Sequence, residues 1–253
     1  MKQIYLRISS TGKIYSLKTS LSLNADQSVL VETDQIIEEG IVIKNPDIFE
    51  EGTGTILRKT TQEDSRILKN LKIKARDFLD EARKKVGRHG LGMQILDAEL
   101  SFDQKKLTFY FSASSRIDFR SLVSDMVRSF GKLIRLQQVG ARDEAKFYGG
   151  IGKCGRELCC SKFLNNLESI TIEMAQVQEL ATAGSAKLSG CCGKLMCCLA
   201  FEVQNYEGIK KKMPKIGSDF KSSQGSGKVV GYNVLEGKVI IEQGPGKRIE
   251  VIV

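Results

Sequence analysis

The first 57 residues alternate apolar and polar positions with a period of two and show no helical period. This alternation predicts short strands separated by polar turns and glycines. The predicted strands cover residues 3–8, 13–17, 28–32 and 36–43. We therefore expect a small β-barrel-like segment at the start of the chain.

A helix is predicted after these strands. Thr61 and Asp64 form a helix-start signal, and apolar residues follow it at intervals of three or four. The residues of this apolar stripe are Ile67, Leu71, Ala75, Phe78, Ala82 and Val86. Gly87 and Gly90 are expected to end the helix.

A strand pair and a second helix follow. Residues 96–102 and 107–111 alternate, which predicts two strands. Asp118 is expected to cap the second helix and Gly131 to end it, before a third strand at residues 132–139. The expected buried face of this helix consists of Phe119, Leu122, Val123, Met126 and Phe130. Helices packed on one face of a sheet make an α+β layer.

The rest of the chain divides into a cysteine-rich part and a glycine-rich part. Helices are predicted at residues 169–180 and 195–212, and Pro214 interrupts the pattern. Glycines then separate short strands at residues 228–232 and 238–242, as in a small SH3-like β-barrel. The predicted fold class is α+β, with a central α/β layer and a cysteine-rich insertion. The predicted domains are residues 1–60, 61–145, 146–213 and 214–253.

Positive charge is concentrated in the first predicted helix. The chain carries a formal net charge of +9, and residues 66–88 contain nine Lys and Arg against three acidic residues. Such a segment can bind RNA, DNA or an acidic protein surface, although a charge run on a helix can equally be a solvated face. The candidate nucleic-acid-binding residues are Arg83, Lys84, Lys85 and Arg88. Aromatic residues make up only 7% of the chain, which leaves few platforms for base stacking.

The sequence predicts a cytoplasmic protein. No stretch approaches the about 20 apolar residues of a membrane-spanning helix, and the N-terminus has no signal-peptide core. Thiols stay reduced in the cytosol, so a cysteine cluster there indicates metal or redox chemistry more often than disulfides.

All seven cysteines lie in two nearly matching cassettes. The first runs from Cys154 to Cys160 as CGRELCC, and the second from Cys192 to Cys198 as CGKLMCC, with Cys191 just before it. Burial alone does not require a repeated pattern of cysteine, glycine and a basic residue. Positive charge favours the thiolate that binds metal, and Arg156 and Lys194 hold equivalent positions. The cassettes therefore predict a soft-metal centre.

The spacing favours an iron–sulfur cluster over zinc. Plant-type clusters use the Cys-x4-Cys interval, whereas structural zinc sites use closer pairs, often with histidine. The only histidine is His89, far from both cassettes. A four-iron cluster takes four cysteines, so seven are too few for two [4Fe–4S] clusters. Either a single cluster draws ligands from both cassettes, or a partner chain completes the clusters. Zinc and a vicinal-dithiol redox switch remain alternatives.

The chain resembles the PSP1-domain proteins of the RicT/YaaT type. The resemblance rests on RDEAK at residues 142–146, GGIGKCGRELCC at 149–160 and KLSGCCGKLMCC at 187–198. It extends outward to residues 61–92 and 214–230, and matches only loosely over the first 60 residues. Carried onto this sequence, it implies metal ligands at Cys154, Cys159, Cys160, Cys192, Cys197 and Cys198, with Cys191 as a further candidate.

The resemblance also implies a function. It implies a non-enzymatic, cytoplasmic regulatory subunit that binds iron–sulfur clusters, with FAD as a further cofactor, and that assembles with small helical proteins of the YlbF/YmcA type. It further implies modulation of RNA processing by the ribonuclease RNase Y and a link to sporulation. The alternative function is a nucleic-acid-binding protein with a structural zinc site. An enzyme is the least favoured class, because the sequence shows no Ser-His-Asp set, P-loop or paired-carboxylate site.

Overall fold

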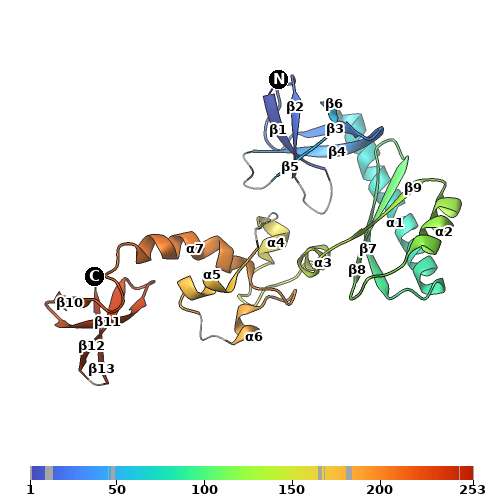
Figure 1. The fold of residues 1–253 in the computed structure, drawn as a ribbon. Coiled ribbons are helices and arrows are strands. Elements are labelled where there is room, and N and C mark those ends of the chain that lie inside the picture. The colour runs from blue at the N-terminus through green and yellow to red at the C-terminus, as the bar shows by residue number, and fades with distance from the viewer. Residues whose placement is uncertain are drawn as a thin grey trace. The chain divides into compact units, whose positions relative to one another are not determined.

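The computed structural model describes residues 2–8, 14–44, 46, 49–164, 167, 169–180, 184–244 and 246–252 (Figure 1). The chain forms two compact units, which are described separately. The first consists of Met1–Asn166 with Cys191–Gly193, and the second of Leu167–Gly190 with Lys194–Val253. The four-domain division remains a prediction. No helix in the described ranges combines the length and apolarity needed to span a membrane.

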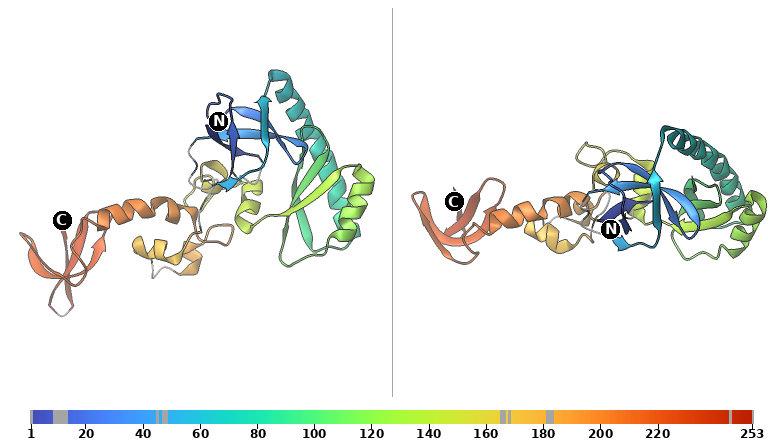
Figure 2. Two further views of the ribbon diagram at one scale, coloured as in Figure 1. Left: turned by 45° about the horizontal axis from the view of Figure 1, so that its top comes forward. Right: turned by 90° about the horizontal axis from the view of Figure 1, so that it is seen from above.

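The first unit begins with a six-stranded sheet (Figure 2). Its strands are β1 (Lys2–Arg7), β2 (Ile14–Thr19), β3 (Ser28–Thr33), β4 (Ile36–Ile43), β5 (Glu50–Glu51) and β6 (Thr55–Lys59). The order β5-β2-β1-β4-β3-β6 leaves β5 and β6 as edges, so the predicted barrel closure is not confirmed. Four predicted strands are confirmed, although Lys13 lies outside the described residues. Their inward positions form one apolar cluster around Leu6, Val29 and Val31.

Helix α1 (Gln62–Arg88) starts with the predicted capping box. The Thr61 hydroxyl accepts a hydrogen bond from the Asp64 N–H at 3.1 Å, and the Asp64 carboxylate accepts from the Thr61 N–H at 2.8 Å. Arg58 donates to the same carboxylate at 3.0 Å. The Arg58 guanidinium and the Thr61 backbone hold the pKa of the Asp64 carboxyl well below its usual range. The helix start is thus fixed by side chains on both sides of the cap.

Other details of α1 differ from the prediction. Gly87 is helical, His89 is the C-cap, and the chain turns at Gly90 with φ +61°. Ile67 is 37% exposed, whereas Leu79, which was not predicted, is buried. A helix of 27 residues is about 40 Å long, whereas an eight-residue strand is about 27 Å. The buried α1 residues in the core shared with the central sheet, which is described next, begin at Ala75, so the first turns of α1 extend past that sheet.

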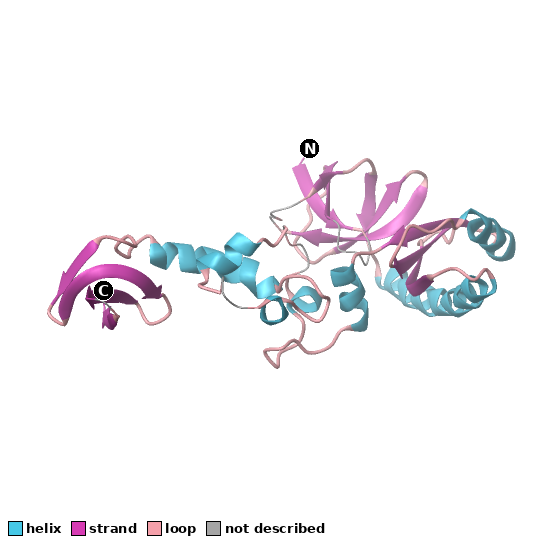
Figure 3. Cartoon of the chain, turned by 60° about the horizontal axis from the view of Figure 1, so that its bottom comes forward, coloured by secondary structure: helices cyan, strands magenta, loops and turns pink. Residues whose placement is uncertain are grey.

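The central sheet has helices packed on one face (Figure 3). It consists of β7 (Met93–Leu100), β8 (Lys106–Ala113) and β9 (Leu133–Gln138), with β8 antiparallel to β7 and parallel to β9. A bulge between Ile95 and Asp97 moves the pattern by one residue, so that Ile95 and Ala98 are buried and Leu96 only partly so. The α+β prediction for this part of the chain is confirmed.

Helix α2 (Arg120–Phe130) ends as predicted and begins differently. Gly131 adopts the left-handed conformation with φ +61° and stops the helix. The N-cap is Phe119 rather than Asp118, and it makes no side-chain cap bond. The Asp118 carboxylate instead accepts a hydrogen bond from the Arg120 N–H at 3.1 Å and forms an ion pair with the Arg120 guanidinium. Asp118 therefore lies one residue before the N-cap.

Lys85, in the basic run of α1, is buried with 6% of its surface exposed. Its ammonium donates to Asp125 at 3.0 Å and to Ser129 at 2.7 Å, both on α2. Lys85→Met is expected to lower the free energy of unfolding by about 1–2 kcal/mol, because the partly exposed Asp125 loses its charged partner. Urea unfolding followed by circular dichroism measures this. The control Lys84→Met alters an exposed neighbour, and an equal loss in both variants would contradict the assignment.

The first unit also contains two short helices, α3 (Ala141–Tyr148) and α4 (Cys159–Lys162). The second unit contains α5 (Ile172–Val177), α6 (Ser185–Leu188) and α7 (Cys197–Lys210). The predicted helix at residues 169–180 is therefore shorter than expected. The helix predicted at residues 195–212 is confirmed as α7.

The second unit ends in a curved four-stranded antiparallel sheet. Its strands, in the order in which they pair, are β10 (Asp219–Ser222), β11 (Gly225–Asn233), β12 (Lys238–Gly244) and β13 (Lys247–Ile252). The order is open at β10 and β13, so the SH3-like barrel is not confirmed. Lys210, at the end of α7, lies 5.5 Å from the Tyr232 ring centroid and 3.5 Å from Glu179 of the segment after α5. The first contact connects α7 to the sheet and the second connects α7 to the segment after α5, all within this unit.

Candidate metal centre in two cysteine knuckles

The first cysteine cassette folds into a tight hairpin that leads into α4. We call residues 150–160 the first knuckle. The Gly152 N–H donates to the Arg156 carbonyl at 2.7 Å, and the Leu158 N–H donates to the Gly150 carbonyl at 3.1 Å. Ile151 and Glu157 form a β-bridge between these two bonds. The hairpin places Cys154 in its turn and Cys159 at the first position of α4.

The second cassette has the same backbone hydrogen bonds. We call residues 188–198 the second knuckle. The Gly190 N–H donates to the Lys194 carbonyl at 2.8 Å, and the Met196 N–H donates to the Leu188 carbonyl at 2.9 Å. Ser189 and Leu195 form the matching bridge. Each bond and bridge lies 38 residues after its counterpart in the first knuckle, so the sequence repeat is also a structural repeat.

The repeat assigns six cysteines to equivalent positions. Cys154 and Cys192 lie in the turns, and the other four open the helices that follow as two adjacent pairs, Cys159 with Cys160 and Cys197 with Cys198. Cys191 occupies the position that Lys153 holds in the first knuckle, so it is outside the repeat. No disulfide joins the seven cysteines, all of which lie in the described residues.

Each knuckle turns at a glycine with positive φ, +77° at Gly155 and +73° at Gly193. A Cβ atom at either glycine would meet no heavy atom within 4 Å, so the requirement for glycine lies in the backbone conformation alone. For a residue that has a Cβ atom, the left-handed backbone conformation costs roughly 1–2 kcal/mol of free energy.

The Gly155→Ala variant is therefore expected to open the first knuckle more often. Amide hydrogen exchange at Leu158 should accelerate about 5- to 30-fold, because its N–H closes the hairpin. Met196 closes the second knuckle in the same way and serves as the internal control. Acceleration at both amides, or at neither, would disprove the local role of Gly155.

The turn of the second knuckle, Cys191–Gly193, belongs to the same compact unit as Cys160 of the first knuckle. Burial raises the pKa of the Cys160 thiol, the Lys146 ammonium lowers it, and ionised Cys192 and Cys191 raise it. Charges act on each other in this way only at short range in water. The Cys160 thiol is thus within electrostatic range of two thiols of the second knuckle.

Lys146 is a residue that sequence reasoning did not assign to the site. Arg156 and Lys194 were expected to favour the thiolates, but the cation that acts on Cys160 is Lys146 of α3. Its signal in the sequence was the RDEAK segment, which was noted only for its resemblance to the family. Lys146 lies 2.7 Å from Asp143 on the same helix.

A complete metal-ligand set is not gathered in the structure. Within the described ranges, no group of three or more His, Cys, Asp or Glu side chains is arranged to hold a metal ion. The thiol chemistry of the knuckles suits a soft metal, and the knuckles supply ligands in pairs. The assignment of the cysteines as metal ligands remains a prediction.

The four candidate nucleic-acid-binding residues have different surroundings. Arg83 donates to the carbonyl oxygens of Ile95 and Leu96 at 3.1 and 3.3 Å, and Lys85 is buried as described above. Lys84 and Arg88 are exposed. Any cationic surface on this part of α1 therefore consists mainly of Lys84 and Arg88.

Comparison with known proteins identifies the family. Residues 54–139 match the PSP1 C-terminal conserved region, and residues 169–213 match the third domain of PSP1-like proteins. The chain is 42% identical over 245 residues to the stage 0 sporulation protein YaaT of Bacillus subtilis, covering 94% of this chain and 89% of that protein.

Two yeast proteins match short segments of the chain. An uncharacterized protein of Schizosaccharomyces pombe is 50% identical over 46 residues, or 18% of this chain and 6% of that protein. Protein PSP1 of Saccharomyces cerevisiae is 45% identical over 40 residues, or 16% of this chain and 5% of that protein. No solved structure matches. On the near full-length match and the two matched domains, the chain belongs to the PSP1/YaaT family.

Proposed function

We propose that this chain is a non-enzymatic regulatory subunit whose two cysteine knuckles together hold an iron–sulfur cluster, and that it modulates RNA processing by a ribonuclease. The B. subtilis relative is named as a sporulation protein, which is consistent with a regulatory role. Small helical proteins of the YlbF/YmcA type are the proposed partners. The observation that carries the metal proposal is the shared hydrogen-bond pattern of the two knuckles.

The proximity of Cys160 to Cys192 supports a ligand set drawn from both knuckles. Each knuckle offers three thiols at the repeated positions, with Cys191 as a fourth in the second knuckle, and adjacent cysteines at the start of a helix point in different directions. A four-cysteine set is therefore more readily completed with thiols from both knuckles than from one. When bound, an iron–sulfur cluster would supply sensitivity to oxygen and to redox state.

The protein's own residues can transmit the state of the second knuckle. Met196 ends that hairpin, and α7 begins at the next residue, Cys197. Gln178, just after α5, donates to the Leu199 carbonyl at 2.6 Å in a buried position. Because metal binding contributes folding energy to its ligand segments, thiolate ligation at Cys197 and Cys198 would stabilise the start of α7. Lys210 at the other end of α7 contacts the C-terminal sheet, which then serves as the regulated docking element.

Metal analysis of the anaerobically purified protein tests this proposal. Iron and acid-labile sulfide should be present in comparable amounts, with broad visible absorbance that bleaches in air. The measurement is made on the chain alone and with its native partners, because a partner could supply a missing ligand. Stoichiometric zinc without iron or sulfide would contradict the proposal that the knuckles hold an iron–sulfur cluster.

The alternative function is nucleic-acid binding with a structural zinc site, which the exposed pair Lys84 and Arg88 favours. The Lys84→Glu/Arg88→Glu variant is expected to weaken RNA binding and to flatten its salt dependence by roughly two units of log–log slope, one for each lost phosphate contact. Fluorescence anisotropy with a labelled single-stranded RNA across a salt series measures both quantities. Unchanged affinity and slope would remove this face of α1 from any RNA site.

A further inference from the structure

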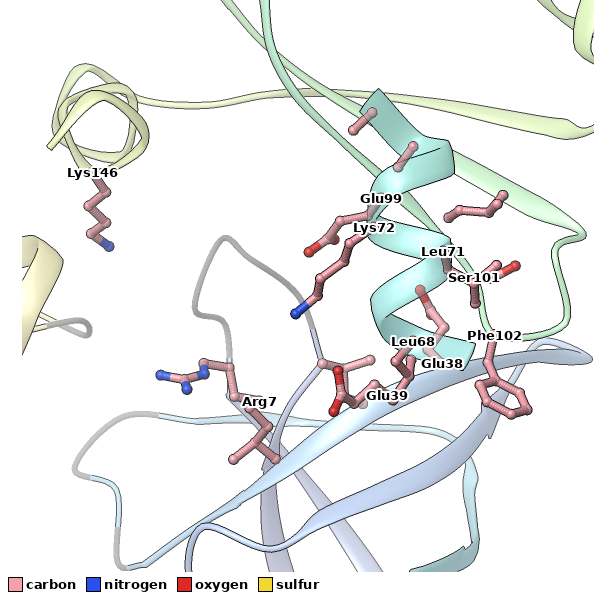
Figure 4. Close-up of a pocket in the computed structure, with 15 residues that line it drawn as sticks. Arg7, Glu38, Glu39, Leu68, Leu71, Lys72, Glu99, Ser101, Phe102 and Lys146 are labelled. Atoms are coloured by element: carbon pink, nitrogen blue, oxygen red, sulfur yellow. The ribbon is translucent and has the colours of Figure 1, made fainter. Parts of the chain in front are cut away.

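A cavity of about 320 Å³ lies within the first unit, and no cysteine lines it (Figure 4). Strands β1 and β4 of the N-terminal sheet form one side, and α1 and β7 form the other. Lys146 of α3 completes the lining. Ligand pockets span roughly 300–1,000 Å³, so this cavity has room for one small organic molecule.

The wall on the side of α1 and β7 is apolar. Leu71 and Ala75 of α1 and Ala98 of β7 line it, and all three are buried. Pockets for small ligands combine such apolar walls with a few polar groups that orient the ligand. The charged groups around the opening therefore decide what the cavity can bind.

The three carboxylates that line the cavity already have partners in the protein. Glu38 accepts from the Lys106 ammonium at 2.8 Å, and Glu39 accepts from the Ser28 hydroxyl at 2.7 Å. Glu99 accepts a short hydrogen bond from the Tyr110 hydroxyl. Lys106 is not part of the cavity lining, and its positive charge offsets the negative charge of Glu38 from outside the cavity. The carboxylates thus have reduced capacity to attract a cation into the cavity.

The cationic side chains that line the cavity have fewer bonded partners than the carboxylates. Figure 4 shows the side chains of Arg7, Lys72 and Lys146, which line the cavity from three different elements. Across the described residues, no hydrogen bond or ion pair engages the Arg7 guanidinium or the Lys72 ammonium. Two cationic side chains without bonded partners lie beside an apolar wall, and this combination suits a ligand that has both an anionic group and an apolar part.

We propose that this cavity is a binding site for a small organic anion, with the apolar body of the ligand against α1 and β7 and its anionic group between Arg7 and Lys72. Arg can bind a carboxylate or a phosphate through two parallel hydrogen bonds, and Lys adds a point charge. The shared chemistry is an anionic head on an apolar body. The proposed anion site uses no cysteine, and Lys146 is the residue that its lining shares with the candidate metal centre.

The test uses 1-anilinonaphthalene-8-sulfonate, an aromatic anion whose fluorescence rises in apolar surroundings. The Arg7→Gln/Lys72→Gln variant is expected to weaken its saturable binding at least about tenfold, since charged hydrogen bonds are lost. The matched control is Lys84→Gln/Arg88→Gln, which removes the same charge from exposed positions and should change binding less than about twofold. Equal weakening in the two double variants would overturn the proposal.

A neutral probe separates charge recognition from loss of fold. N-phenyl-1-naphthylamine has the same ring system without the sulfonate, and it should bind the wild type and Arg7→Gln/Lys72→Gln equally. A parallel loss of both probes would mean that the variant damages the cavity, and the proposal would fall. If the double variant does not fold, Lys72→Gln alone gives the same comparison, because Lys72 is exposed in the structure.

Competition identifies the anionic group. Phenyl phosphate and benzoate are titrated against the bound sulfonate probe. Displacement by phenyl phosphate assigns a phosphate ligand, and displacement by benzoate assigns a carboxylate ligand. If neither compound displaces the probe at millimolar concentration, the fluorescence reports apolar surface elsewhere and the cavity is not the site.

Discussion

Serine in place of Cys192 is expected to remove most of the metal bound by the protein, whereas serine in place of the adjacent Cys191 should leave the metal content unchanged. Cys192 occupies the position of Cys154 in the repeated hairpin, and Cys191 occupies that of Lys153. A serine hydroxyl stays protonated near neutral pH and is a poor ligand for a soft metal. The expected loss in metal affinity for Cys192→Ser is more than about tenfold.

Iron, sulfide and zinc per chain, measured after anaerobic purification of both variants, test this expectation. The two variants alter neighbouring residues of the same turn, so damage to the hairpin would affect both. Equal loss in the two variants would show that Cys191 is also a ligand or that the turn is disrupted. If zinc rather than iron disappears in Cys192→Ser, the knuckle is the metal site but the cluster assignment is wrong.

Local patterns predicted most of the fold. The alternation in the first 57 residues located four strands of the N-terminal sheet, and the capping signal at Thr61 located the start of α1. Closure of a sheet depends instead on whether its edge strands pair, which no local pattern encodes. In the six-stranded sheet, the edge strands β5 and β6 do not pair with each other. The strands were therefore predicted correctly, but the barrel that they were expected to form is not confirmed.

Long-range contacts account for the remaining differences. The burial of Lys85 depends on Asp125, 40 residues further along the chain, so the basic run alone suggested a solvated cation. Similarly, the bulge beside Ile95 changes which residues of β7 face the core, and a strict alternation does not reveal it. In both cases the competing influence is tertiary packing rather than local propensity.

In the candidate site, too, some features follow from local sequence patterns and others from long-range contacts. The repeated cassette predicted two equivalent sets of cysteines, and the structure shows that each set lies on a hairpin with the same turn, which was not predicted. The offset of 38 residues already aligned Cys191 with Lys153, and the paired hydrogen bonds show that the backbone follows the same alignment. The sequence did not reveal Lys146, which acts on Cys160 from a different helix.

Alanine at Gly227 is expected to destabilise the C-terminal sheet by about 2–3 kcal/mol, because its Cβ would overlap the neighbouring strand. That Cβ would lie 2.4 Å from the carbonyl oxygen of Glu242 and 2.8 Å from its carbonyl carbon. Both atoms belong to the backbone of β12, so the clash can be relieved only by moving one strand away from the other. Overpacking against a flexible side chain would cost less.

Gly231 supplies a matched control in the same strand, β11. A Cβ there would meet only side-chain atoms of Ile240, the nearest at 3.5 Å, which is ordinary contact. Gly231→Ala should therefore be neutral, or stabilising by up to about 1 kcal/mol through reduced freedom of the unfolded chain. The two substitutions add the same methyl group, so their difference isolates the close approach of the strands.

Amide hydrogen exchange at Val229 of β11 reads out this difference, since its N–H donates at 2.9 Å to the carbonyl of Ser218, just before β10, and opening of the sheet breaks this bond. Exchange should accelerate about 30- to 150-fold in Gly227→Ala and stay near the wild-type rate in Gly231→Ala. Leu107 in the core of the other unit should be unaffected by both variants. Equal rates at Val229 in the two variants would mean that β11 and β12 can separate at Gly227 without cost, and the sheet would then be too loosely paired to act as the docking element proposed for it.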